Sequence, residues 1–373
     1  MHTLRTTTLL AAWAAQSAAH AAAATSPTRV ASGPLPDRLK VAWRFKTGGP
    51  VTSSAAIAAG RVYIGSSDGR IYALRLSDGR RLWSFKTGDI VEAPVTVAGS
   101  AVLAGSVDGH LYCLDAATGR LRWKHRTDDK IMGGAAVAQA PGGRGTWVLV
   151  GSYDNRVHCV DLASGKPVWT YETDNYVNGT PAVGQGRVMF GGCDGLLHVV
   201  DLATGKRIRA IEVGEYIAGS ATVEGDLAYL GHYGHEVVAV NTATGRVLWR
   251  YRDRSFPYFA TPAVTPDRVV IGGRDKRVHC LHRATGKAVW TFRTRGKVDS
   301  SATVCDGKVV VGSEDGRLYI IGLADGKERF AHNIGAPIIS SPAVEAGTVV
   351  VGANDGFVYA FRAAGQAAGA VRP

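Results

Sequence analysis

The sequence lacks the motifs by which many enzymes are identified. No Gly-x-Ser-x-Gly elbow, phosphate-binding loop or Cys-x-x-Cys pair occurs in its 373 residues, so no motif supports a hydrolase, a kinase or a thiol oxidoreductase. Cysteine is scarce: the chain has five, and an odd number cannot all pair internally. Cys113, Cys159 and Cys280 occupy one position of a repeat, where other copies carry apolar residues. This is typical of buried free cysteines, and we predict no structural disulfide.

Beyond its N-terminal region, the sequence also lacks an apolar stretch long enough to cross a bilayer. The N-terminal region resembles an export signal, because Arg5 precedes an apolar core at residues 9–15 and an Ala-x-Ala pattern at residues 19–21. We expect a signal peptide over residues 1–21, a flexible leader rich in Ala, Thr, Ser and Pro over 22–40, and a C-terminal tail over 364–373. No cysteine that could carry a lipid anchor lies near the cleavage pattern. The expected location is periplasmic or otherwise extracytoplasmic.

Acidic residues are outnumbered, with 31 Asp and Glu against 43 Lys and Arg, for a formal net charge of +12. The basic residues are spread over the chain and do not form a stripe interleaved with stacking aromatics, which argues against a nucleic-acid partner. Two explanations of the charge stay open. Either the repeats multiply solvated basic turns, or the protein is attracted to an anionic surface of the cell envelope.

What the sequence does contain is an internal repeat. A turn of the form Gly-x-x-Asp-Gly recurs eight times with some variation, with its first glycine at Gly65, Gly105, Gly151, Gly191, Gly231, Gly272, Gly312 and Gly352. Successive glycines are separated by 40, 46, 40, 40, 41, 40 and 40 residues, and the longest step contains a loop insertion at residues 139–146. In the cleanest copy, residues 101–106, 111–115 and 121–126 are expected to be strands. This period suits a four-stranded propeller blade.

A second turn, of the Thr-Gly-Lys/Arg type, follows in seven copies, and a tryptophan usually lies three residues beyond its basic residue. Arg209 replaces the tryptophan in the fourth copy and Phe330 replaces it in the seventh. The eighth copy stops after Phe361, before this last strand, whereas residues 41–48 around Trp43 match that strand alone. We therefore predict an all-β, eight-bladed propeller over residues 41–363, closed by the N-terminal strand in the last blade.

The pattern Asp-x-x-Thr-Gly-Lys/Arg-x-x-Trp, as in residues 115–123, resembles the tryptophan-docking repeat of the pyrroloquinoline quinone (PQQ) type propellers. The resemblance covers residues 41–363. Such propellers serve both as quinoprotein dehydrogenases and as non-catalytic scaffolds, so the resemblance implies the fold more specifically than the function.

The residues that enter the innermost strands are candidates for a ligand site in the channel. At one equivalent position, three of the eight copies carry Glu92, Asn178 and Asp299. PQQ dehydrogenases are similar in using Glu, Asn and Asp around a calcium ion, so the resemblance implies PQQ with calcium as an alternative cofactor. The vicinal cysteine pair and the long insertions of those enzymes are missing, and isolated polar residues on a wet channel wall explain the three positions more simply. We expect no cofactor.

Histidine offers a second candidate. His158, His198 and His279 stand where other copies carry tyrosine, so we interpret them as packed rings on separate blades and expect no metal site.

One loop departs from the repeat. Residues 252–259 carry Arg254, Phe256, Tyr258 and Phe259, and aromatics beside an arginine are typical of a protein interface. These four residues are the candidates for binding a partner; alternatively, the rings pack between blades.

These features predict a non-catalytic, extracytoplasmic scaffold for other proteins of the cell envelope. The repeat type, blade number and length resemble the propeller subunits of the outer-membrane β-barrel assembly machinery, which implies a role in outer-membrane protein assembly. Those subunits are typically anchored through a cysteine that this sequence does not show. The alternatives are a PQQ-dependent oxidoreductase and a sensor or polymer-binding propeller.

Overall fold

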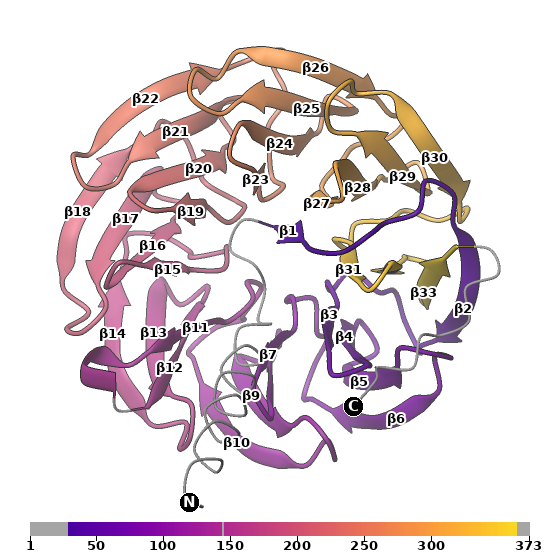
Figure 1. The fold of residues 1–373 in the computed structure, drawn as a ribbon. Coiled ribbons are helices and arrows are strands. Elements are labelled where there is room, and N and C mark those ends of the chain that lie inside the picture. Colours follow the sequence, from indigo (N-terminus) through magenta and orange to yellow (C-terminus); the bar gives the residue numbers. More distant parts are fainter. Residues whose placement is uncertain (1–28, 144, 364–373) are drawn as a thin grey trace, which may run out of the picture.

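In the computed structural model, which describes residues 29–143 and 145–363, eight four-stranded antiparallel sheets form a ring around a central channel (Figure 1). The predicted eight-bladed propeller is therefore confirmed. The predicted signal peptide and C-terminal tail lie outside the described residues. None of the helices among the described residues is long and apolar enough to cross a membrane.

Each blade contributes a short innermost strand next to the channel. In chain order these strands are β3 (Ala56–Ala58), β7 (Thr96–Ala98), β11 (Ala136–Gln139), β15 (Ala182–Gly184), β19 (Thr222–Glu224), β23 (Ala263–Val264), β27 (Thr303–Cys305) and β31 (Ala343–Glu345). The second strands are β4 (Arg61–Ser66), β8 (Ala101–Gly105), β12 (Thr146–Gly151), β16 (Arg187–Gly191), β20 (Leu227–Gly231), β24 (Arg268–Gly273), β28 (Lys308–Gly312) and β32 (Thr348–Gly352). A 3-10 turn, η1 (Pro141–Gly143), lies in the inserted loop before β12.

The third strands are β5 (Arg70–Arg75), β9 (His110–Asp115), β13 (Arg156–Asp161), β17 (Leu196–Asp201), β21 (Val237–Asn241), β25 (Arg277–His282), β29 (Arg317–Gly322) and β33 (Phe357–Arg362). The outer strands are β6 (Arg81–Lys86), β10 (Leu121–Arg126), β14 (Pro167–Glu172), β18 (Arg207–Glu212), β22 (Arg246–Tyr251), β26 (Ala288–Arg293), β30 (Glu328–Asn333) and, for the eighth blade, β2 (Lys40–Lys46). The N-terminal strand β2 pairs with β33, which confirms the predicted closure of the ring.

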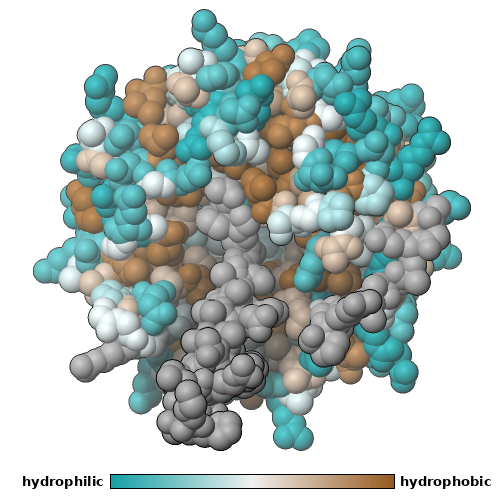
Figure 2. Space-filling model, viewed as in Figure 1, coloured by the Kyte–Doolittle hydropathy of each residue, from teal (hydrophilic) through white to brown (hydrophobic). Residues whose placement is uncertain are grey.

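The core lies between neighbouring blades. The second and third strands are buried on both faces, because each blade packs on the next, whereas the outer strands alternate between half-buried and exposed residues. Figure 2 shows the result on one face, where hydrophilic residues dominate the periphery. All five cysteines are free, and four of them are buried.

The turn between the second and third strands needs a left-handed residue. The residues that adopt it are Gly69, Gly109, Asn155, Gly195, His235, Lys276, Gly316 and Gly356, all with positive φ. Glycine adopts this conformation without strain, which explains the recurring Asp-Gly pairs. Three copies keep a side chain there despite the strain.

Tryptophans join six of the eight blades to the blade that follows. Their indole Nε1 atoms donate to main-chain oxygens of the following blade, in the pairs Trp43–Leu76, Trp83–Ala116, Trp123–Leu162, Trp169–Leu202, Trp249–Arg283 and Trp290–Leu323. In the fourth blade, Arg209 Nε donates to Ala243 O instead. The resemblance to tryptophan-docking repeats thus has a physical basis in this chain.

Residues 29–39, which fall within the expected flexible leader, make defined contacts with the seventh blade. β1 (Val30–Ala31) pairs in parallel with β27 as a fifth strand beside the channel. Leu35 is 1% exposed within the core between the seventh and eighth blades. Its main-chain N–H donates to Asp306 and its carbonyl accepts from Lys308. The buried side chains of Leu35 and Leu39 hold this segment in place. The Ala- and Pro-rich composition of the leader did not indicate this burial.

Candidate protein-binding face

One face of the ring is formed by two sets of segments that hydrogen-bond to each other in every blade. The first set is the incoming loops, which lead into the innermost strands, and the second is the turns between the second and third strands. A main-chain N–H of each turn donates to a carbonyl of the incoming loop, in the pairs Ser67–Pro50, Val107–Ile90, Tyr153–Lys130, Cys193–Tyr176, Tyr233–Tyr216, Arg274–Pro257, Glu314–Lys297 and Asn354–Pro337. We call this surface the loop face.

Aromatic residues gather on the loop face from the third to the sixth blade. The rings of Tyr153 and Tyr176 stack with centroids 4.7 Å apart. Tyr216 lies 6.2 Å from Tyr233, and Tyr233 lies 4.5 Å from Phe259. Tyr176, Tyr216 and Tyr233 are 44%, 51% and 45% exposed. We call these five residues the aromatic arc, and exposed rings of this density are typical of binding surfaces.

Arg274 ends the aromatic arc with a positive charge. Its guanidinium carbon lies 4.0 Å from the centroid of the Phe259 ring. Its Nη2 donates to Asp299 Oδ2 at 2.7 Å, and its Nε donates to Asp299 Oδ1 at 3.1 Å. Burial alone would lower the pKa of Arg274, but the Asp299 carboxylate opposes it and the pKa rises above its usual value. Arg274 is thus held in place as a permanent cation.

Beside Arg274, the sixth blade contains a basic pocket of about 290 Å³. Its cationic residues come from three segments: Arg254 from the incoming loop, Arg274, Lys276 and Arg277 from the turn and the start of β25, and Arg293 from the end of β26. Phe256 and Asp275 complete the lining.

The incoming loop of the sixth blade, residues 252–262, lines one side of the pocket. It is longer than the other seven. In four other blades a main-chain N–H of the incoming loop donates to the aspartate of the turn, in the pairs Gly48–Asp68, Gly88–Asp108, Asp128–Asp154 and Arg295–Asp315. Asp275 has no such donor, and its buried Oδ2 has no hydrogen-bond partner among the described residues. The pocket lies between this loop, the turn and the end of β26.

The four predicted partner-binding residues differ in their exposure to solvent. Phe256 is 47% exposed, the Arg254 side chain is 52% exposed, and Phe259 belongs to the aromatic arc. Tyr258 is 1% exposed and packs against His279, with ring centroids 5.3 Å apart. Tyr258 is therefore not available to a partner. Its ring packs in the core between the fifth and sixth blades, which was the alternative predicted for the aromatic residues of this loop.

The three channel candidates do not share one environment. Asp299 has both carboxylate oxygens engaged by Arg274, so it would bind calcium only after that ion pair broke. Glu92, Asn178 and Asp299 lie on the incoming loops of the second, fourth and seventh blades. Among the described residues, no group of three potential metal ligands includes Glu92 or Asp299. These residues, as placed, do not fit the calcium ion of a quinoprotein.

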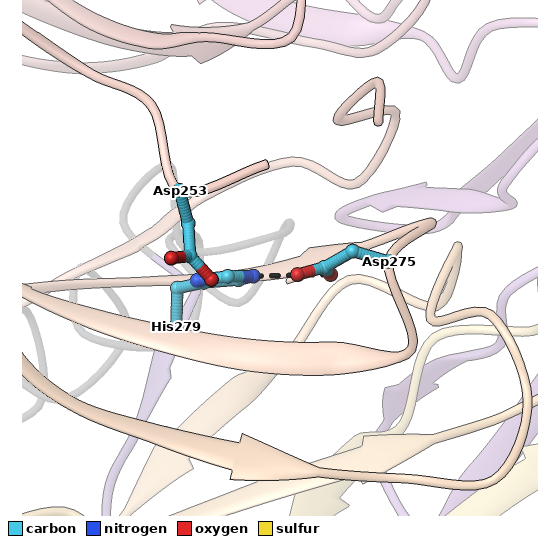
Figure 3. Close-up of side chains that lie close together, drawn as sticks. All are labelled: Asp253, Asp275 and His279. Carbon is cyan, nitrogen blue, oxygen red and sulfur yellow. Dashed lines mark hydrogen bonds and ion pairs between the residues drawn. The ribbon is translucent and has the colours of Figure 1, made fainter. Parts of the chain in front are cut away.

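One cluster of possible metal ligands does occur in the described chain, formed by Asp253, Asp275 and His279 (Figure 3). His279 Nε2 lies 3.2 Å from Asp275 Oδ1, and its Nδ1 lies 3.1 Å from the Tyr251 hydroxyl. Arg277 approaches both carboxylates at 3.9 Å. Both ring nitrogens are occupied and a cation is already present, so the cluster is poorly suited to a metal ion.

The other two candidate histidines, His158 and His198, also contact the aspartate of the turn in their blade. His158 Nε2 lies 2.9 Å from Asp154, and His198 Nε2 lies 2.8 Å from Asp194. In other blades, Tyr72, Tyr112, Tyr319 and Tyr359 donate from their hydroxyl groups to the matching aspartates. The interpretation of these histidines as replacements for packed rings agrees with these contacts.

Sequence reasoning missed four of the five residues of the aromatic arc and most of the basic pocket. Tyr153 and Tyr233 follow the second residue of the turn, and Tyr176 and Tyr216 precede a buried aliphatic residue of the incoming loop. The signal was present as aromatic residues at matching positions of consecutive copies. It becomes informative only once the two sets of segments are known to lie together.

Known protein families and solved structures that resemble this chain have the same fold. The family model described as outer membrane protein assembly factor BamB matches residues 37–107, 107–257, 193–277 and 274–368. No curated protein matches the chain in sequence.

Similar solved structures include BamB from Moraxella catarrhalis, with 22% identity, a TM-score of 0.73, and coverage of 88% of this chain and 99% of that one. The computationally designed Ika8 protein has 18% identity and a TM-score of 0.77, covering 87% of this chain and 99% of that one. A europium-containing methanol dehydrogenase has 15% identity and a TM-score of 0.69, covering 90% and 96%. At these identities the likeness shows the shared fold, which an assembly factor, a designed protein and an enzyme all use.

Proposed function

The chain belongs to the family of PQQ-like repeat propellers described as outer membrane protein assembly factor BamB, and on this basis we propose that it is a non-catalytic scaffold that binds other proteins of the cell envelope through its loop face. The finer role proposed is in the assembly of outer-membrane proteins, by analogy with that family. An extracytoplasmic location follows from the export signal expected at residues 1–21.

The aromatic arc is the observation that carries this proposal. Tyrosine and arginine are enriched among the residues that dominate binding energies at protein interfaces. Tyr176, Tyr216 and Tyr233 expose about half of their surface on one face, and the arc ends at Phe259, on which the fixed cation of Arg274 stacks. A large rigid ring loses little conformational entropy on binding, which suits it to a contact with a partner.

Site-specific photo-crosslinking in cells tests the proposal. A photoreactive residue at Tyr216 should capture defined envelope proteins, and one at Leu121, which is 45% exposed on the outer strand β10, should not. Tyr216→Ser with Tyr233→Ser should abolish capture from a probe at Tyr176. Components of the outer-membrane assembly machinery among the captured proteins support the finer role. Capture of a wall polymer or a wall enzyme instead, or equal capture from both positions, would count against it.

The alternative function, a PQQ-dependent oxidoreductase, has a direct test of its own. Purified protein is titrated with PQQ and calcium while the quinone absorbance is followed. We expect no saturable binding, because Asp299 is engaged by Arg274. Stoichiometric binding together with dye-linked alcohol oxidation would replace the scaffold proposal by the enzymatic one.

A further inference from the structure

The basic pocket is set apart by charge from the rest of the loop face. Five cationic residues line it, and Asp275 is the one acidic residue among them. The positive charges are only partly balanced: Arg274 pairs closely with Asp299, whereas Arg254 and Arg277 approach Asp253 no closer than 3.9 Å. Lys276 and Arg293 have no ion pair with any described residue, and both are exposed. Such a concave cluster attracts anions.

Lys276 contributes its charge from a strained backbone conformation. Its φ is 65°, in the turn position where five other blades have glycine. A side chain with a β-carbon in this conformation costs about 1 kcal/mol relative to glycine. The sixth blade thus keeps a strained lysine at the rim of the pocket.

We propose that the basic pocket binds the carboxylate side chains of an extended acidic peptide segment of a partner protein, with neighbouring apolar residues of that segment resting on the aromatic arc. The inference rests on the proposed scaffold function and names the chemistry of its partner. Arginine forks bind carboxylates in a bidentate manner, and three arginines besides Arg274 line the pocket. The surface next to it is apolar: Arg274 belongs to the pocket and stacks on Phe259, which contacts Tyr233.

The shape and surroundings of the pocket favour a peptide over the other anions and over a metal ion. A bilayer surface is broad and flat, whereas the pocket is a cavity of about 290 Å³, a volume near the lower end for ligand sites and suited to one or two side chains. Phe256 in its lining and the aromatic arc beside it offer apolar contacts that a free inorganic anion cannot use. A divalent cation at Asp253 and Asp275 would face the five positive groups instead.

The test uses the full-length purified protein and a synthetic peptide that alternates Asp and Leu, with an Asn-and-Leu peptide for comparison. Calorimetry should show binding of the acidic peptide that weakens with added salt, and much weaker binding of the Asn peptide. The triple variant Arg254→Gln/Lys276→Gln/Arg293→Gln should weaken binding about tenfold or more, and each single change about threefold.

The matched control removes three positive charges from the opposite face. Arg120→Gln/Lys166→Gln/Lys206→Gln changes exposed residues in the turns between third and outer strands, and it should leave peptide binding within twofold of the unchanged protein. Circular dichroism confirms that both triple variants are folded. Equal loss in both variants would mean non-specific attraction to net charge and would overturn the inference, as would no binding of the acidic peptide to the unchanged protein.

Vesicles of phosphatidylglycerol and phosphatidylcholine test the lipid alternative. Pocket-dependent binding of these vesicles, without peptide binding, would assign the pocket to an anionic membrane surface and overturn the inference. The outcome is separable from that of the scaffold proposal. If crosslinks from Tyr216 persist while the peptide fails to bind, only the inference fails; if the peptide binds but Tyr216 captures no envelope protein, the scaffold proposal fails.

Discussion

Trp43 Nε1 lies 2.9 Å from the carbonyl oxygen of Leu76 and donates a hydrogen bond to it. This contact joins the eighth blade, whose outer strand is β2, to the first blade. The acceptor of each docked tryptophan is the residue directly after the third strand of the next blade. The seventh blade carries Phe330 at the tryptophan position, and a phenyl ring has no N–H to donate.

We predict that Gly119→Ala destabilises the protein far more than Gly60→Ala. Both glycines have φ near +70°, but a β-carbon at Gly119 would lie 2.6 Å from the Trp83 ring, whereas one at Gly60 would meet no atom within 4 Å. Gly60→Ala should cost about 1 kcal/mol from backbone strain alone, and Gly119→Ala about 2 to 4 kcal/mol, because the indole must move. Urea unfolding gives both values. Equal losses would show that the ring is free to shift.

The repeat made most of the fold predictable. A turn such as Val107-Asp108-Gly109 and the tryptophan at position 123 are local signals with a fixed spacing, and repetition specifies how each copy packs on the next. The basic pocket lacks such a signal. Arg254, Lys276 and Arg293 lie in three separate segments, and no repeated spacing relates their side chains. Side-chain direction in that irregular loop has no period, so Tyr258 could not be distinguished from Phe256 without the structure.

Arg209→Trp should stabilise the protein. Arg209 stands at the tryptophan position of the fourth blade, and its Nε donates to Ala243 O at 3.1 Å. The nearest Arg209 atom lies 3.7 Å from a β-carbon built at Gly245, compared with 2.5 to 2.7 Å where an indole packs on this glycine in other blades. An indole would fill that space and donate its N–H to the carbonyl oxygen of Thr242, the residue directly after β21, for a gain of about 0.5 to 2 kcal/mol.

The control for this substitution is Arg209→Leu, which is apolar but has no donor. It should give a smaller gain or none, because leucine provides no N–H donor for the main-chain oxygens that follow β21. Melting temperatures of the three proteins, measured in parallel, decide the question. A loss of stability in Arg209→Trp would mean that the fourth and fifth blades do not use the common docking geometry.

Leu35→Ala should destabilise the protein by about 2 to 4 kcal/mol, the usual cost of truncating a buried leucine. Leu35 lies in the core between the seventh and eighth blades, within the segment that leads to β2. Val30→Ala, at a residue 37% exposed on β1, is the matched control and should change the free energy of unfolding by less than about 0.5 kcal/mol. If both changes were neutral, residues 29–39 would not contribute to folding.

Stability should fall as the pH drops below about 6.5, the ordinary histidine value, and His232 should account for part of this loss. His232 is 1% exposed, and burial lowers its pKa; Glu236 and Glu215 raise it, and Arg250 and Arg252 lower it. Below its usual pKa, the unfolded chain therefore binds a proton that the folded chain does not. The free energy of unfolding then decreases with falling pH, by at most about 1.4 kcal/mol per pH unit for one group.

The variant His232→Ser tests this assignment. Serine occupies the same position in other blades, as Ser66, Ser106, Ser152 and Ser313. Unfolding free energies measured between pH 4.5 and 7.5 should decrease less steeply with acidification in this variant than in the unchanged protein. The aspartates with lowered pKa, Asp108, Asp154 and Asp194, lose their contribution mainly as the pH falls below their ordinary value of 3.8, which lies under this window. His282→Ser, at an exposed histidine, controls for the loss of an imidazole, and if it changed the slope as much as His232→Ser, burial of His232 would not be the cause.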